Sequence, residues 1–223
     1  SAGIPASAGD VANLTFDLTA NRTVTIDTAS RTVGVLNIGD PASGYFAYTL
    51  AASGGATLTF DNNGGGALLA KPTAANTVLD VISAPITLAD NLTIDTAVTG
   101  ADNSGVSLRI SGGISESGPR SLTKNGVGGV YINNSGNIYS GGTILNAGEI
   151  QFSTSFAFGT GPLTVNGGSL VARTASRTLT NSMTVGGDFT FNGSNAGCNS
   201  LTLSGNVDLG AATRTITVAI TAN

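Results

Sequence analysis

Short strand-like phrases of one composition recur along the chain and restrict its fold more than any other feature. An apolar residue, a threonine, a second apolar residue and an aspartate follow one another at four places, which end at Asp17, Asp27, Asp61 and Asp95. Because side chains alternate between the two faces of a strand, each phrase places its apolar pair on one face and its threonine on the other. An aspartate suits the following turn, where its carboxylate can accept bonds from nearby backbone. We therefore predict short strands that end in these four aspartates as turn residues.

The spacing of the phrases suggests a structural period. The second and third phrases are 34 positions apart, and so are the third and fourth. A one-residue slip would turn every side chain of a strand to the opposite face, so the apolar pairs are expected to share one continuous core. The second apolar residue of each phrase is predicted to point into this core, and these residues are Phe16, Ile26, Phe60 and Ile94. The threonines between the apolar positions are predicted to face outwards.

The composition favours a β-solenoid over other all-β folds. Charged residues are only 10% of the chain, whereas roughly 25% is typical, and glycine occupies 32 positions. Hydrophobic residues make up 40%, which is enough for a packed core. Apolar residues recur at i and i+2 rather than at helical spacing, so almost no helix is expected. Many short strands with self-similar phrases between glycine-rich turns favour a solenoid rather than a sandwich or a barrel.

Several function classes are excluded by the residues that are rare or missing. The net charge of -4 and the scattered basic residues argue against nucleic-acid binding. No apolar run approaches the roughly 20 residues of a membrane-spanning helix, so this segment is not expected to insert into a membrane. The chain has no histidine and one cysteine, Cys198, which excludes a Ser-His-Asp triad and a zinc cluster. A buried thiol is the preferred interpretation of Cys198, and an intermolecular disulfide or reactive thiol is the alternative. No cofactor or metal is predicted.

One block of 30 residues carries a specific resemblance. Residues 122–151 read LTKNGVGGVYINNSGNIYSGGTILNAGEIQ. This block resembles the autotransporter-associated β-helix repeat, whose usual form is close to LTKxGxGTLxLSGxNTYxGGTxxNAGTLQ. The resemblance implies a right-handed parallel β-helix in a secreted or surface-displayed bacterial protein. The matching positions are Leu122, Thr123, Lys124, Gly126, Gly128, Asn137, Tyr139, Gly141, Gly142, Thr143, Asn146, Ala147, Gly148 and Gln151.

The residues of the block agree with such a helix. Gly142 and Gly148 are predicted at tight corners. Ile144 and Ile150 are expected to point inwards, with Thr143 and Gln151 pointing outwards. The predicted organisation is a lead-in segment, 1–10, followed by a single continuous β-solenoid, 11–223, whose most family-like repeat is 122–151. Coils of roughly 20 to 25 residues would give about nine to eleven coils.

The residues that could form an enzymatic or sugar-binding site can also have purely structural roles. Parallel β-helix enzymes that cleave acidic polysaccharides use clustered carboxylates with a basic residue, whereas the acids here are mostly at turn positions. No catalytic residue is therefore predicted. Two aromatic clusters, 45–48 and 152–158, could stack on sugars if exposed, but an internal stack is preferred. An ice-binding threonine array is disfavoured by the irregular spacing of the threonine pairs.

The sequence favours a non-enzymatic structural protein at a bacterial cell surface or outside the cell, as a spacer or fibre-forming subunit. An adhesin or carbohydrate-binding surface and a polysaccharide-degrading β-helix enzyme are the alternatives, and a surface polysaccharide is the alternative partner. A solenoid exposes a strand edge and a slice of core at each end unless a cap covers it. Apolar and other residues still alternate in the last strand-like run, residues 215–220. The apolar residues Ile216, Val218 and Ile220 are therefore predicted to form an end-stacking interface. The predicted partner is a second copy joined head to tail, or further coils of a longer parent chain.

Overall fold

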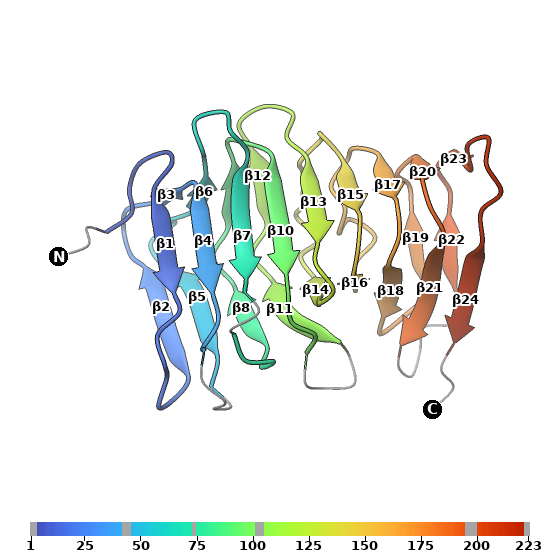
Figure 1. Cartoon of the computed structure of the whole chain (residues 1–223). Helices are drawn as coiled ribbons and strands as arrows, with labels where there is room; N and C mark the ends of the chain where they lie inside the picture. The colour runs from blue at the N-terminus through green and yellow to red at the C-terminus, as the bar shows by residue number, and fades with distance from the viewer. Residues whose placement is uncertain (1–3, 42–45, 73–74, 101–104, 195–199, 221–223) are drawn as a thin grey trace.

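The protein is a parallel β-helix. The computed structural model describes residues 4–41, 46–72, 75–100, 105–194 and 200–220, which form 24 strands and no helix. The strands pair in parallel, and they lie side by side from the N-terminal to the C-terminal end of the molecule (Figure 1). The predicted all-β solenoid is confirmed, as is the expectation of almost no helix in the described part of the chain.

Two long sheets and two shorter ones make up the walls. Sheet A contains β1 (Val11–Leu14), β4 (Val35–Ile38), β7 (Ala67–Lys71), β10 (Leu92–Thr96), β13 (Leu122–Asn125), β15 (Thr143–Leu145), β17 (Leu163–Val165), β20 (Met183–Val185) and β23 (Val207–Asp208). Sheet B contains β2 (Arg22–Ile26), β5 (Tyr48–Ala52), β8 (Asp80–Ile82), β11 (Val106–Ile110), β14 (Gly129–Ile132), β16 (Glu149–Phe152), β18 (Ser169–Arg173), β21 (Phe189–Ser194) and β24 (Ile216–Ile220). Sheet C contains β3 (Arg31–Val33), β6 (Leu58–Phe60), β9 (Ile86–Leu88) and β12 (Ile114–Glu116), and sheet D contains β19 (Arg177–Leu179) and β22 (Leu201–Leu203).

The chain visits sheet A, sheet B and then a third wall before it returns to sheet A one strand further along. Sheets C and D form this third wall in the early and late coils. Between them the wall has no strands, but backbone bonds continue the stacking, from Ile138 N to Ile114 O and from Thr160 N to Tyr139 O, both 2.9 Å. Sheets A and B each contain nine strands, which agrees with the lower end of the predicted range of coils.

Coil length varies because the connections from sheet A to sheet B vary. In-register partners of sheet A are 33 residues apart between Val35 and Leu68, but only 20 apart between Thr164 and Thr184. The connection from β7 to β8 spans residues 72–79, whereas three residues, 146–148, connect β15 to β16. Connections of seven or more residues occur in the first four coils and again in the last, where residues 209–215 join β23 to β24.

The core consists of side chains that stack in register along the rod. Successive inward residues of sheet A pair from coil to coil, and they are almost fully buried. This column contains Leu36, Leu69, Ile94, Lys124, Leu145, Val165 and Val185. The outward positions beside it include Thr93, Thr123 and Thr164, which are half-buried. Neighbour-on-neighbour stacking of this kind is how repeat folds bury a continuous core.

The 34-residue spacing of the sequence phrases is not the repeat of the solenoid. The phrase ending at Asp27 belongs to sheet B, the one ending at Asp61 to sheet C, and the one ending at Asp95 to sheet A. Each 34-residue step therefore covers one complete coil and also the distance from one wall to the next. Ile26, Phe60 and Ile94 are nevertheless buried as predicted, because strand alternation fixes the face whichever wall the strand joins.

The predicted inward position of Phe16 is wrong. Strand β1 ends at Leu14, and the side chain of Phe16 is 77% exposed. The buried Tyr48 of the next coil holds the backbone at this point. Its hydroxyl accepts a bond from Phe16 N (3.0 Å) and donates one to Phe16 O (2.9 Å). The chain has thus left the sheet before its second apolar position, so the alternation no longer applies.

The register predicted for β15 is wrong by one residue. Thr143 and Leu145 face the core, and Ile144 lies in the outward row between Thr123 and Thr164. The cause is the buried Tyr139, whose hydroxyl lies 2.6 Å from Thr143 Oγ1. An inward threonine satisfies this hydroxyl, which an isoleucine could not do. Burial also raises the pKa of the Tyr139 phenol.

Strand β16 has the predicted alternation of Ile150 and Gln151. Ile150 is fully buried in the core. Gln151 lies in the opposite row with Tyr131 and Val171, yet it is only 1% exposed and is therefore covered rather than solvated.

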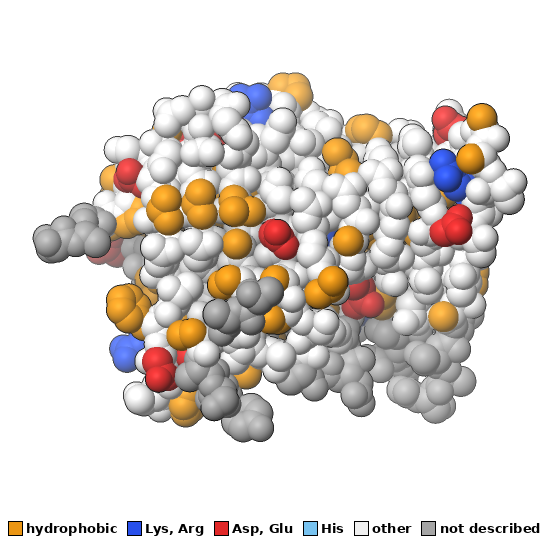
Figure 2. Space-filling model, viewed as in Figure 1, with side chains coloured by type: hydrophobic (Ala, Val, Ile, Leu, Met, Phe, Trp, Pro, Cys, Tyr) orange, Lys and Arg blue, Asp and Glu red, His pale blue; other side chains and the backbone are white. Residues whose placement is uncertain are grey.

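The outer face of sheet A changes character along the rod. Val11, Val35 and Leu68 pair in register and form an apolar row, which is visible over β1, β4 and β7 in Figure 2. From Thr93 onwards most residues of this row are threonines, with Ile144 between Thr123 and Thr164 and Asp208 after Thr184. Beside it, the later turns carry an asparagine ladder in which Asn146 Nδ2 donates to Asn125 Oδ1 (2.9 Å). Asn166 Nδ2 donates in turn to Asn146 Oδ1 (2.8 Å).

Candidate functional site

A buried pair of opposite charges lies at the corner that carries the long A–B loops. Lys71 ends β7 and Asp80 begins β8, and both face the core because they alternate with outward residues of their strands. Both side chains are fully buried, and Lys71 Nζ lies 2.5 Å from Asp80 Oδ2. This contact joins sheet A to sheet B inside one coil.

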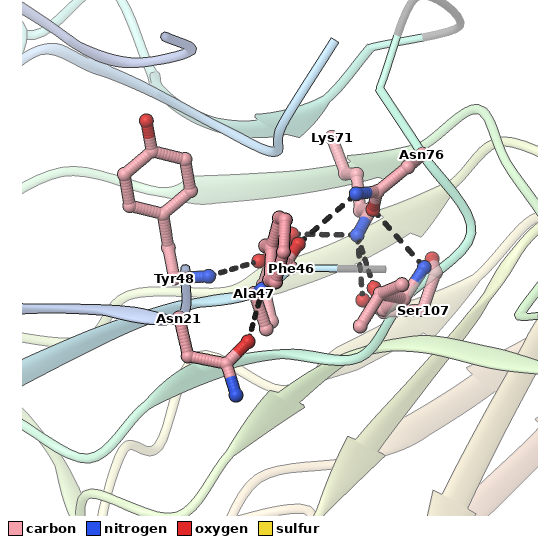
Figure 3. Close-up of polar contacts among 9 residues, drawn as sticks. Asn21, Phe46, Ala47, Tyr48, Lys71, Asn76 and Ser107 are labelled. Carbon is pink, nitrogen blue, oxygen red and sulfur yellow. Dashed lines mark hydrogen bonds and ion pairs between the residues drawn. The ribbon is translucent and has the colours of Figure 1, made fainter. Parts of the chain in front are cut away.

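Backbone carbonyls complete the surroundings of the ammonium group. Lys71 Nζ donates to Val78 O at 2.5 Å and to Ser107 O at 3.2 Å (Figure 3). Ser107 belongs to the next coil, at a point where the register of β11 against β14 shifts between Val106 and Leu108. Together with Asp80, the two carbonyls provide one acceptor for each N–H of the ammonium.

The two oxygens of Asp80 have different partners. Oδ2 faces Lys71, whereas Oδ1 accepts a bond of 2.7 Å from the backbone N–H of Tyr48. A second carboxylate, that of Asp40, is fully buried nearby and accepts a bond from Leu18 N at 3.4 Å. Its charge acts on both members of the Lys71–Asp80 pair.

Burial shifts both members of the pair towards their neutral forms. Removal from water lowers the pKa of the Lys71 amine, and the opposing attraction of Asp80 is the smaller effect. Removal from water likewise raises the pKa of the Asp80 carboxyl, against the attraction of Lys71. The negative charge of Asp40 raises the pKa of Asp80 further. Burial therefore disfavours the charged forms that both groups would have in water.

Hydrogen bonds connect the A–B loops of successive coils around this pair. Asn76 Nδ2 donates to Phe46 O (3.0 Å), which ties the loop of the third coil to that of the second. Asn21 Oδ1 accepts a bond from Ala47 N (2.9 Å), which ties the second to the first (Figure 3). The corner is therefore a connected polar network beneath the long loops.

A second buried lysine has surroundings of a different kind. Lys124 faces the core of sheet A and is fully buried. Its Nζ donates to three backbone carbonyls, those of Asn125, Gly126 (3.0 Å) and Ala147 (3.4 Å). Burial lowers the pKa of Lys124 to about 8, against weaker attraction by Asp95 and Glu149.

The two ends of the rod are open apolar cavities. The N-terminal cavity has a volume of about 360 Å³, and its lining includes Ile4, Leu14, Val24 and Leu36. The C-terminal cavity, of about 160 Å³, is lined only by apolar residues: Leu170, Met183, Val185, Phe189, Phe191, Leu201, Leu203, Val207, Ile216 and Val218. Each end therefore presents a slice of the core.

The predicted end-stacking residues lie on β24, the last strand of sheet B. Ile216 is 43% exposed and Val218 is 62% exposed, and both line the C-terminal cavity. Ile220 ends the strand, and its side chain lies outside the described part. Strand β24 pairs only with β21, so its other edge carries unpaired backbone groups within the described residues.

The four predicted turn aspartates do not share one role. Asp61 accepts a local bond from Asn63 N (3.0 Å), and the exposed Asp27 lies 3.8 Å from Arg31. Asp17 is exposed in the connection after β1. Asp95 lies inside β10 rather than at a turn, so that placement was wrong.

The two predicted corner glycines lie in turns that require glycine. Gly142 and Gly148 have φ values of 95° and 71°, a region that side chains other than glycine rarely adopt. At Gly148 an added Cβ would come within 2.3 Å of Gly126 O and 2.4 Å of Gly128 O.

The aromatic clusters divide between the core and the surface. Phe152 and Phe158 pack edge to face inside the rod, with ring centres 5.0 Å apart, whereas Phe156 is exposed. Phe46 is half-buried and Tyr48 is buried. Tyr45 and Cys198 lie outside the described residues.

The described part of the chain contains neither a metal-binding cluster nor a membrane-spanning helix. Within the described ranges, no three aspartate, glutamate or cysteine side chains lie close enough together to hold a metal ion. None of the described segments is a helix with the length and apolar character needed to cross a membrane.

Sequence reasoning missed the Lys71–Asp80 pair. The available signal was the run ALLAK, in which alternation places Lys71 on the same face as Ala67 and Leu69. The partner could not be predicted, because the loop between β7 and β8 decides which face Asp80 presents.

Comparison with known proteins gave no match, whether against family models, curated proteins or solved structures.

Proposed function

We propose that this chain is a non-enzymatic structural β-solenoid that acts as a spacer or fibre-forming subunit through stacking at its ends. The observation that carries the proposal is the pair of open apolar cavities, one at each end of the rod. A soluble monomer rarely exposes its core in this way. A further coil, from a second copy or from a longer parent chain, would cover both the apolar slice and the strand edges.

The shape of the contact supports assembly in one direction. The N-terminal end offers the edges of β1 and β2, and the C-terminal end offers those of β23 and β24. These strands belong to the same two sheets, so head-to-tail contact would continue sheets A and B without a change of direction. Such a contact is heterologous and does not close on itself, so repeated copies grow into a filament.

The side walls support a spacer role and a location outside the cell. Threonines predominate on the outer face of sheet A beyond the first coils, and an asparagine ladder links the later turns. Such a surface is polar with few charges. The resemblance of residues 122–151 to autotransporter-associated repeats supports a bacterial extracellular or cell-surface setting.

The test is sedimentation of the 223-residue chain over a concentration series. We expect the mean mass to rise with concentration, because end contacts bury apolar area. The variant Val218→Lys places a charge in the C-terminal cavity and is expected to remain a monomer. The control Thr184→Lys adds the same charge to an exposed wall position and should assemble like the parent.

Two results would contradict the proposal. One is a parent chain that stays monomeric at the highest concentration. The other is Val218→Lys assembling as strongly as Thr184→Lys, because the contact would then lie elsewhere on the molecule.

A further inference from the structure

We propose that Lys71 and Asp80 form an intramolecular isopeptide bond, which makes the corner between β7 and β8 covalent. The reacting groups are the amine of Lys71 and the carboxyl of Asp80, whose Nζ and Oδ2 atoms are in contact at 2.5 Å. Both side chains are fully shielded from water. This inference does not depend on the proposed end stacking.

The chemistry balances without an added reactant. A proton passes from the Lys71 ammonium to Asp80 Oδ2, which leaves a neutral amine beside a carboxylic acid. The amine lone pair attacks Asp80 Cγ, a C–N bond forms, and the carbonyl electrons move onto Oδ1. A second proton passes from nitrogen to the Oδ2 hydroxyl, the C–O bond breaks, and one water molecule leaves. The products are one amide and one water, with no oxidation or reduction.

The contacts of the pair suit each step. The Tyr48 N–H donates to Oδ1, the oxygen on which negative charge develops during the attack, and so stabilises that charge. Oδ2, the oxygen that leaves, is the one facing the amine. The carbonyls of Val78 and Ser107 hold the nitrogen in place. One of them can accept the remaining N–H of the amide product.

The dry surroundings favour reaction over a persistent ion pair. Both pKa values are shifted towards the neutral forms that react, and Asp40 favours the protonated form of Asp80. Two groups fixed in contact react at an effective concentration on the order of 10⁵ to 10⁸ M when their alignment is good. The amide also replaces two buried charges, which are costly to keep out of water, with one neutral group.

A glycine of the second coil, Gly39, lies directly against the pair. Gly39 has a φ of 141°, and a Cβ at this position would overlap Ala75 Cβ at 2.5 Å. It would also lie 3.6 Å from both Asp80 Oδ2 and Lys71 Cε. The absence of a side chain lets the strand exit pass close to the pair, and it places the buried Asp40 next to it.

The first test is the intact mass of the purified, denatured chain. We expect a mass lower than the sequence mass by one water molecule. Trypsin should then release residues 32–109 as one peptide, because Lys71 is followed by Pro72, and fragmentation of this peptide should locate the link between Lys71 and Asp80. An intact mass equal to the sequence mass would overturn the proposal.

Variants test the assignment of the two residues. Lys71→Arg has no amine that can form this bond, and the double variant Lys71→Met with Asp80→Leu keeps the site apolar if the single variant fails to fold. Both should keep the full sequence mass. The matched control is Lys124→Arg, which changes the other buried lysine and should still lose one water. Loss of water that persists in Lys71→Arg, or that disappears in Lys124→Arg, would show that the link is not between Lys71 and Asp80.

Discussion

The replacement Ile94→Ala tests whether the stacked columns hold the rod together. Ile94 is fully buried in β10, and its neighbours in the column are Leu69 on one side and Lys124 on the other. The change removes three carbons, worth about 2.4 kcal/mol at about 0.8 kcal/mol for each buried carbon. A cavity term adds to this, because neighbouring strands fixed by ladders on both sides cannot move in to fill the space. We expect a loss of roughly 3 to 4 kcal/mol of unfolding free energy.

Urea unfolding followed by circular dichroism measures this loss, and Thr93→Ala in the same strand is the control. Thr93 faces outwards and is half-buried, so its replacement should cost well under about 1 kcal/mol. Because repeat folds can unfold coil by coil, amide exchange of β7, β10 and β13 should also report the loss locally. Equal effects of the two replacements would refute the assignment of Ile94 to the column that stabilises the rod.

Two further predictions concern a buried charge and a corner. The folded pKa of Lys124, about 8, is below its ordinary value of 10.5, so the unfolded chain binds more protons between these values and stability should rise with pH across that window. The gain in unfolding free energy should reach roughly 3 kcal/mol. A denaturation series from pH 7.5 to about pH 10.5 should show this gain in the parent chain but not in Lys124→Met. If the unfolding free energies of the two chains change in parallel with pH, the prediction is contradicted. Gly148→Ala should destabilise the chain by several times more than Gly64→Ala in thermal unfolding. Both glycines have positive φ, but only at Gly148 would the added Cβ overlap backbone oxygens, whereas at Gly64 it meets nothing within 4 Å. Equal melting temperatures of the two variants would show that the corner can relax.

The predictions that failed share one physical origin. Strand alternation assigns each residue a face only while the chain remains in the strand. Phe16 lies beyond the end of β1, and Thr143 faces inwards because the buried hydroxyl of Tyr139 needs a partner there. Neither the end of a three- or four-residue strand nor the need of the buried Tyr139 hydroxyl for a partner four residues away can be read from strand periodicity.

The sequence by itself determined the all-β class, the alternating core and the approximate number of coils. These follow from local chemistry, because period-2 patterning and glycine-rich turns leave few other solutions. Tertiary structure decided which wall each strand joins, since the A–B connections differ in length from coil to coil. It also decided that Lys71 meets Asp80. Two charged residues nine positions apart become a buried pair only when the loop between them folds back and the next coil covers them.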